Sequence, residues 1–288
     1  MKIKWLFLGK FIVSFITFLS VAVLVYLPFI SMQFNRPINA SYQSLAIAHA
    51  GGGMPLNGNT YTYLNCQESF DIYYADGTRY FEYDLAFTLD KKIVGVHDWS
   101  EIPGYSFNTP MTSNEYSEYR ILNQFKGVTL EFLFDTIENY PDIKIILDTK
   151  EFNEIALYLE IINQAEINNI NIYNCFIPQI YSTEMFDILK EFNFKEFIFT
   201  CYKSTYSNNK ILKFVNSNDK ITILTMTLKK RLQMDITSLL KKGKRVAIHT
   251  LNTNSEIDYS FASGASLIYT DYVTENQMQK IAQKYYNK

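Results

Sequence analysis

The chain has 288 residues, of which 48% are hydrophobic and 19% charged, the composition of a globular protein with a large core. Its formal net charge is -2 and no block of like charge stands out, which excludes the basic stripe of a typical nucleic-acid binder. The three cysteines, Cys66, Cys175 and Cys201, are odd in number and widely spaced, which excludes a disulfide framework.

The first predicted element is a hydrophobic segment near the N-terminus. Phe11 to Ile30 carries no charge, and a helix of that length spans about 30 Å, the hydrocarbon thickness of a bilayer. Lysines precede it, so the positive-inside rule predicts a single-pass protein of the cell membrane with the remaining chain outside the cytoplasm. A cleaved signal peptide is the alternative, but the residues that follow make a poor cleavage site. We expect a basic cytoplasmic stub at 1–10, a transmembrane anchor at 11–31 and a linker at 32–43.

After the linker, short apolar runs alternate with amphipathic segments. The runs are rich in β-branched and aromatic residues, as expected of strands buried on both faces. This alternation predicts an α/β fold with a parallel sheet, and its length favours a TIM-type (β/α)8 barrel over residues 44–288. The predicted strands are Ser44–His49, Tyr80–Leu85, Ile93–His97, Ile143–Thr149, Tyr173–Pro178, Glu196–Cys201, Ile221–Met226, Arg245–Thr250 and Leu267–Thr270.

Nine strands are one more than such a barrel holds, so one of them is expected outside it. Only residues 86–92 separate the second and third runs, which is too few for a crossover helix, so we expect an irregular connection there. Thr112-x-x-Glu115 and Thr274-x-x-Gln277 predict helix starts with capping boxes.

Polar residues near the ends of the predicted strands are the candidates for chemistry, because a TIM barrel places its active site at the C-terminal ends of its strands. His49 and His97 end two of the runs. Glu82 and Asp84 lie two apart on another run and therefore share one face of it. Asp148, near the end of the fourth run, can meet them at the mouth of the barrel.

Three converging carboxylates repel one another unless a cation neutralises them. Hard oxygen ligands favour Mg²⁺ or Ca²⁺ over zinc, so we expect one divalent cation at Glu82, Asp84 and Asp148. The two histidines beside it supply a general base and a general acid, and the cation and Lys150 can hold the charge of a phosphoryl group.

The ordered set of motifs resembles the glycerophosphodiester phosphodiesterases, which belong to the phospholipase C-like phosphodiesterase barrels. The likeness rests on four motifs in order: His-x-Gly-Gly, Glu-x-Asp, His-Asp and a strand that carries an acidic-x-Lys pair. It covers roughly residues 44–275, and a Trp after the His-Asp pair makes it similar to a divergent "HAGG" subgroup. The matching segments are IAHAGG at 47–52, FEYDLAFTLDKKIVGVHDW at 81–99 and IILDTK at 145–150, with weaker similarity at 65–70 and 246–271.

The resemblance implies hydrolysis of a glycerol- or polyol-linked phosphodiester, with a small-molecule or lipid-derived substrate. It makes His49 and His97 the acid–base pair and leaves open which of them is the acid. The two glycines after His49 fit either a phosphate loop or a turn, and Trp99 fits either a substrate roof or a loop anchor. The residues expected to bind substrate or phosphate are Lys150, Gly51, Gly52, Asn65, Gln179 and Trp99.

Two residues depart from the family pattern. Ala50 stands where the family usually has Arg, which removes a bidentate phosphate contact, and Asp148 stands where Glu is usual. Two alternatives therefore stay open beside the hydrolase. One is a phosphatidylinositol-type phospholipase C or lyase that stops at a cyclic phosphate. The other is a catalytically inactive barrel that binds a phosphorylated polymer.

Overall fold

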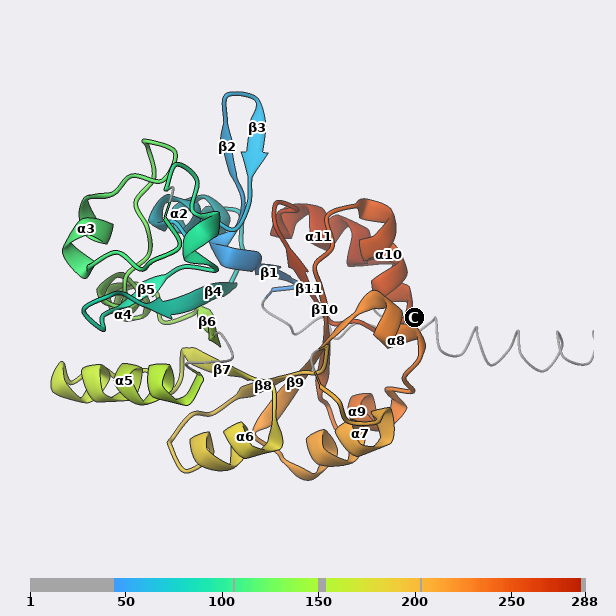
Figure 1. The fold of residues 1–288 in the computed structure, drawn as a ribbon. Coiled ribbons are helices and arrows are strands. Elements are labelled where there is room, and N and C mark those ends of the chain that lie inside the picture. The colour runs from blue at the N-terminus through green and yellow to red at the C-terminus, as the bar shows by residue number, and fades with distance from the viewer. Residues whose placement is uncertain (1–43, 106, 150–153, 203, 286–288) are drawn as a thin grey trace, which may run out of the picture.

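A closed parallel barrel forms the centre of the molecule (Figure 1). The computed structural model describes residues 44–105, 107–149, 154–202 and 204–285. Within these ranges eight parallel strands follow one another around the barrel, and pairing between β1 and β4 closes it, so the predicted TIM-type architecture is confirmed. The strands are β1 (Ala46–Ala48), β4 (Tyr80–Phe87), β6 (Lys144–Thr149), β7 (Phe176–Ile180), β8 (Phe197–Thr200), β9 (Ile221–Thr227), β10 (Arg245–His249) and β11 (Leu267–Thr270).

Helices surround the barrel on its outer side (Figure 1). Several begin at a Ser or Thr whose side chain accepts a hydrogen bond from the first helical turn. Both predicted capping boxes are confirmed, at the starts of α3 (Ser113–Glu118) and α11. The helices around the barrel are α2 (Gln67–Ala75), α4 (Leu130–Asn139), α5 (Glu154–Ile167), α6 (Thr183–Leu189), α7 (Asn208–Ser217), α8 (Leu228–Leu232), α9 (Thr237–Lys241), α10 (Asn254–Ala262) and α11 (Glu275–Ala282), with the short η3 (Gln283–Tyr285) after the last.

The strand that lies outside the barrel is β5 (Ile93–Gly95). It pairs antiparallel with β4, so the irregular connection expected at 86–92 is the return turn of a β-hairpin. The third run is therefore not a barrel strand that ends in His97. Instead, the return strand brings the chain back beside β4, where the Val96 amide donates a 2.8 Å hydrogen bond to the Asp84 carbonyl. This backbone contact sets the position of His97.

A small lobe lies beside β5 and has its own hydrophobic cluster. Trp99, Met111 and Tyr116 are among the buried residues of that cluster. The hairpin of β2 and β3 projects from the molecule nearby (Figure 1). Besides β5 and α3, the elements here are η1 (His49–Gly51), β2 (Met54–Leu56), β3 (Asn59–Tyr61) and η2 (Trp99–Glu101).

The inside of the barrel is layered because strand side chains alternate between its two faces. One layer is apolar and buried, and comprises Ile47, Tyr80, Ile146, Ile177, Ile198, Ile223, Ala247 and Leu267. Two residues further along each strand the side chain points inward again, closer to the C-terminal mouth. These positions are His49, Glu82, Asp148, Gln179, Thr200, Thr225, His249 and Tyr269, and they line a single cavity. An apolar floor thus supports a polar upper layer.

The predicted membrane anchor requires a correction. Among the described residues no helix is both long enough and apolar enough to cross a bilayer. The helix α5, with 14 residues, is the longest in that part of the chain and reaches only about 21 Å. The predicted stub, anchor and linker at 1–43 lie outside the described residues. Within the described residues the fold is therefore corrected to a TIM-type barrel alone, and they support neither the predicted span nor the predicted single-pass location in the cell membrane.

Candidate active site

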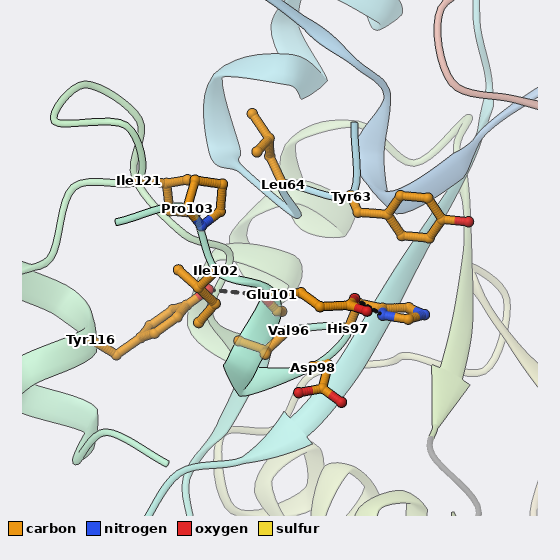
Figure 2. A pocket seen from close by; sticks show the side chains of 11 residues that line it. Tyr63, Leu64, Val96, His97, Asp98, Glu101, Ile102, Pro103, Tyr116 and Ile121 are labelled. Carbon is orange, nitrogen blue, oxygen red and sulfur yellow. Dashed lines mark hydrogen bonds and ion pairs between the residues drawn. The ribbon is translucent and has the colours of Figure 1, made fainter. Parts of the chain in front are cut away.

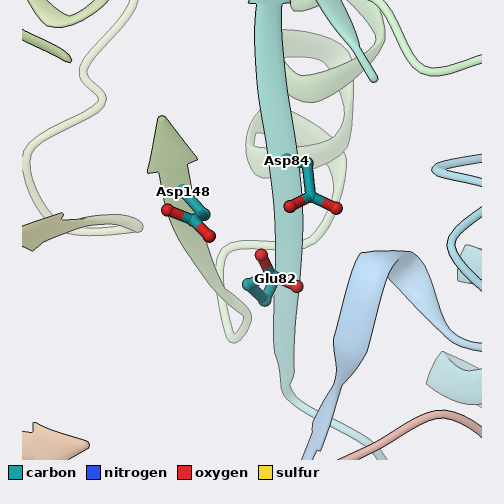
Figure 3. A group of neighbouring side chains, drawn as sticks. All are labelled: Glu82, Asp84 and Asp148. Atoms are coloured by element: carbon teal, nitrogen blue, oxygen red, sulfur yellow. The ribbon is translucent and has the colours of Figure 1, made fainter. Parts of the chain in front are cut away.

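Three carboxylates meet at the mouth of the barrel (Figure 3). Glu82 and Asp84 share one face of β4, and Asp148 lies opposite Asp84 on the neighbouring β6. All three are buried, with relative exposures of 1%, 2% and 8%. One oxygen from each lies within 4.8 Å of the others. The i, i+2 spacing on β4 and the register with β6 therefore produce the convergence that the sequence predicts.

Neutral groups hold the two carboxylates of β4 in place. The Ala50 amide donates a 2.7 Å hydrogen bond to Glu82 Oε2. Asn65 makes two contacts with Asp84: its Nδ2 donates to Asp84 Oδ2 over 3.1 Å, and its Oδ1 accepts from the Asp84 amide over 3.0 Å. Asn65 thus fixes the position of Asp84, and the buried Ala50 fixes Glu82 through its backbone amide.

Asp148 is held by a chain of polar side chains that runs from the end of β7 to β11. The Tyr181 hydroxyl donates to Asp148 Oδ1 over 2.5 Å and accepts from Gln179 Nε2 over 2.9 Å. At its other end Gln179 Oε1 accepts from the Tyr269 hydroxyl over 2.8 Å. Although Asp148 is a methylene shorter than Glu, its carboxylate still reaches the other two.

The carboxylates lie in an environment that opposes their negative charge. Burial raises the pKa of Glu82 above the ordinary carboxyl range, and the charge of Asp84 raises it further. Three buried oxygen donors within ion-sharing distance are the ligand set that a hard divalent cation such as Mg²⁺ or Ca²⁺ takes. The residues present therefore fit a cation.

His49 lies beside this cluster, at the end of β1, and is oriented by a carboxylate from β11's end. Its Nδ1 is 2.8 Å from Asp271 Oδ1, and the two side chains are only 13% and 10% exposed. Asn252 fixes Asp271 in turn, because its Nδ2 donates to Asp271 Oδ2 over 2.5 Å and its Oδ1 accepts from the Asp271 amide over 2.9 Å. Burial opposes a charged imidazole, but the bond to Asp271 and the charge of Glu82 outweigh it and raise the pKa of His49 to about 9.

His97 forms a second histidine–carboxylate pair, closer to the solvent. Its Nδ1 is 2.6 Å from Glu101 Oε2, and Figure 2 shows these two side chains together with the Tyr63 ring above them. The Tyr63 ring stands edge-on between the histidines, with its centroid 4.7 Å from that of His49 and 4.9 Å from that of His97. The structure thus places the two predicted histidines on either side of one tyrosine, each with its Nδ1 against a carboxylate.

The glycines after His49 have positive φ angles of +80° at Gly51 and +98° at Gly52. A β-carbon on Gly51 would lie 2.7 Å from the Tyr83 ring, and one on Gly52 would collide with the Tyr73 ring. Glycine is required at these two positions because the turn has positive φ angles and because two tyrosine rings leave no space for a side chain.

The remaining predicted binding residues have different surroundings. Gln179 and Asn65 belong to the networks around the carboxylates described above. Trp99 is 9% exposed and packs against Tyr105 and Tyr116 in the cluster of the small lobe. Lys150 lies outside the described residues.

Several residues at the site were not among the predicted catalytic, metal-binding or substrate-binding residues. Asp271 directly follows a predicted strand, so the strand-end rule that selected His49 applies to it too. Glu101 lies four residues after His97, but that spacing predicts a contact only if the local chain turns. Tyr63 and Tyr181 carry no signal in the sequence that distinguishes them from the other tyrosines.

No protein-family profile matches this chain, and no curated protein matches it in sequence. Solved structures match it in fold. A glycerophosphodiester phosphodiesterase from Parabacteroides distasonis is 18% identical, with a TM-score of 0.63 over 84% of this chain and 98% of that one. A glycerophosphodiester phosphodiesterase from Thermotoga maritima is 17% identical, with a TM-score of 0.61 over 84% and 99%.

An Oleispira antarctica phosphodiesterase in complex with the product sn-glycerol-3-phosphate is also 17% identical, with a TM-score of 0.61 over 84% of this chain and 98% of that one. The chain therefore has the fold of the glycerophosphodiester phosphodiesterases, as the motif resemblance implies. The narrower likeness to an "HAGG" subgroup stays a prediction.

Proposed function

We propose that this chain is a phosphodiester hydrolase that uses one divalent cation and two histidines to cleave a glycerol- or polyol-linked phosphodiester. The observation that carries the proposal is the convergence of Glu82, Asp84 and Asp148 beside His49 at the C-terminal mouth of the barrel. The shared fold supports the reaction class. The glycerol phosphate in the Oleispira structure supports the kind of substrate.

Glu82, Asp84 and Asp148 are the residues that would hold the cation, which we expect to be Mg²⁺ or Ca²⁺. A cation of this kind supplies Lewis-acid stabilisation of the negative charge that develops on the phosphoryl oxygens. Asn65, the Ala50 amide and Tyr181 serve this site indirectly, because their hydrogen bonds fix the orientation of the three carboxylates.

The histidines move the protons. In each of them Nδ1 is turned to a carboxylate, so Nε2 is the nitrogen that can face the substrate. One imidazole removes the proton from the attacking hydroxyl or water as the new bond to phosphorus forms. The other gives a proton to the alkoxide that leaves. Asp271 and Glu101 orient the rings, and Asp271 also stabilises the imidazolium form of His49.

The test is a hydrolysis screen on a panel of glycerophosphodiesters with added Mg²⁺ or Ca²⁺, repeated with chelator and with His49→Ala. We expect the chelator to abolish turnover. We expect His49→Ala to reduce kcat by about 10²- to 10⁴-fold, the usual contribution of a general acid or base. Asp187→Ala is the control, because this side chain is 61% exposed and pairs with Lys190 on an outer helix. Turnover that survives both treatments would refute the proposal.

Phosphorus NMR of the products separates hydrolysis from its nearest rival. A hydrolase releases a phosphomonoester. A lyase of the phospholipase C type leaves a cyclic phosphate that persists after the substrate is consumed, and that result would replace our proposal.

A further inference from the structure

The proposed chemistry uses only one side of the cavity at the barrel mouth. Glu82 and Asp148 come from β4 and β6, and His49 from the end of β1. The opposite side is formed by β8, β9 and β10. We call it the polar wall, and it consists of Thr200, Thr225 and His249, with Tyr202 at its rim.

Three polar atoms of this wall are buried without a hydrogen-bond partner among the described residues. They are Thr200 Oγ1, Thr225 Oγ1 and His249 Nε2. Thr200 is fully buried at 0% exposure. A buried polar atom without a partner costs free energy, so native proteins rarely retain one unless something else satisfies it. All three residues line the same cavity, and therefore one ligand can contact more than one of these atoms.

The polar wall is also uncharged. Burial, together with the charge of His49, lowers the pKa of His249 to about 4, so the imidazole is neutral at neutral pH. Among the described residues that line the cavity there is no lysine or arginine. A phosphoryl group therefore finds its positive partners on the carboxylate side, through the cation and His49. The polar wall fits a neutral group that donates and accepts hydrogen bonds.

The neighbouring amide differs from these atoms, because each of its ends already has a hydrogen-bond partner in the protein. Gln179 Nε2 donates to Tyr181 and Gln179 Oε1 accepts from Tyr269. The shape of the wall is fixed from the outside as well: the Tyr202 ring packs against His249 with 4.7 Å between ring centroids. Tyr202 is 43% exposed, so it borders the opening through which a ligand enters.

We propose that the polar wall is the subsite for a hydroxyl-bearing alcohol group of the substrate, recognised by His249 Nε2 and Thr200 Oγ1. This inference rests on the proposed function, because it assigns the phosphoryl group to the cation side of the same cavity. His249 is thereby a specificity-determining residue rather than a structural one.

The test compares two phosphate monoesters that share a three-carbon chain. sn-Glycerol 3-phosphate carries two hydroxyl groups that n-propyl phosphate lacks. Binding of each is measured by titration calorimetry with Mg²⁺ for the wild type, His249→Phe, His249→Gln and Thr200→Val. Thr78→Val is the matched control, because Thr78 is also fully buried and its Oγ1 also has no partner among the described residues. Thr78 precedes β4 at the other end of the barrel.

We expect the wild type to bind glycerol phosphate about tenfold more tightly than propyl phosphate, the worth of one or two hydrogen bonds. His249→Phe and Thr200→Val should each remove about three- to tenfold of this preference and leave propyl phosphate binding unchanged. His249→Gln should restore part of it, and Thr78→Val should keep all of it.

Equal binding of the two monoesters by the wild type would overturn the subsite, as would a preference that survives both His249→Phe and Thr200→Val. Binding of neither monoester would overturn it as well. The hydrolysis assay separates this failure from that of the proposed function. A protein that hydrolyses glycerophosphodiesters but does not discriminate retains the function and loses the subsite. A protein that discriminates but does not hydrolyse retains the subsite and loses the function.

Discussion

At the base of the barrel, below the apolar layer, Glu196 precedes β8 and is surrounded by positive charge. Its carboxylate lies 2.9 Å from Arg245 Nη2 and 3.2 Å from Lys144 Nζ, and it accepts a 2.9 Å hydrogen bond from Thr222. At the mouth, above the same layer, one oxygen from each of three carboxylates lies within 4.8 Å of the other two. Amide and hydroxyl groups hold these carboxylates in place. Among the described residues, two cationic side chains face the single carboxylate of Glu196 at the base, whereas His49 lies beside three buried carboxylates at the mouth.

The two ends shift their carboxyl groups in opposite directions. Burial disfavours ionisation of Glu196, but Arg245 and Lys144 outweigh it and hold the pKa of Glu196 below its ordinary value. Burial raises the pKa of Glu82, and Asp84 adds to the effect. The charge of Glu196 is therefore balanced within the chain, whereas at the mouth our proposal assigns that balance to a divalent cation. This is the division expected in a TIM barrel, where the N-terminal face serves stability and the C-terminal face serves chemistry.

The largest expected effect comes from Glu82→Gln at the mouth. We expect kcat/KM to fall about a thousandfold, because a cation ligand that contributes about 4 kcal/mol to the transition state is lost. In chelator the same variant should melt at a higher temperature than the wild type, since a neutral amide avoids the cost that burial and Asp84 impose on the Glu82 carboxylate. Assays of turnover and thermal unfolding check both parts. Full activity, or a lower melting temperature in chelator, would break the contrast between the two ends.

The same substitution at the base, Glu196→Gln, should have the opposite result. Arg245 and Lys144 would then face a neutral amide, and we expect the free energy of unfolding to fall by about 2 kcal/mol. The activity of the folded fraction should be unchanged, because an apolar layer separates Glu196 from the mouth. Urea unfolding and kcat at a temperature well below the transition provide the two measurements. A variant with lower kcat and unchanged stability would show that the base takes part in catalysis.

Some features of the mouth could be predicted from the sequence, and others could not. The carboxylates were predictable because the i, i+2 spacing of Glu82 and Asp84 is a local property of a strand. The direction of β5 was not, because a short apolar run reads the same whether its strand pairs parallel or antiparallel. The structural basis of His97's position was therefore missed, although its proximity to the carboxylates was expected. The hairpin fixes the backbone beside His97 through the contact between Val96 and Asp84, and the His97 ring lies against Tyr63, which also contacts His49.

Side-chain contacts between residues far apart in the chain could not be predicted from the sequence either. His49 and Asp271 are 222 positions apart and meet only because the first and last strands of the barrel are neighbours. The closed barrel was predicted, but the side-chain pairing across its seam depends on the register of β1 with β11. The tyrosine rings that make Gly51 and Gly52 necessary are a packing detail of the same kind. Local spacing thus predicts which groups reach the mouth, and tertiary register decides which of them touch.

The smallest expected effect is the response of the base to acid. The pKa of Glu196 is lower in the folded chain than its ordinary value, so the unfolded chain binds more protons in the range between the two values. The stabilisation is therefore fully present above the ordinary carboxyl pKa of about 4.3 and is lost as the pH falls through the lower folded value. One carboxyl contributes at most about 1.4 kcal/mol per pH unit to this slope. Urea unfolding from pH 6 down to about pH 3, in wild type and Glu196→Gln, should give a shallower loss of stability in the variant. Equal slopes would mean that Arg245 and Lys144 do not favour the Glu196 charge in the folded state, and the base would then resemble the mouth.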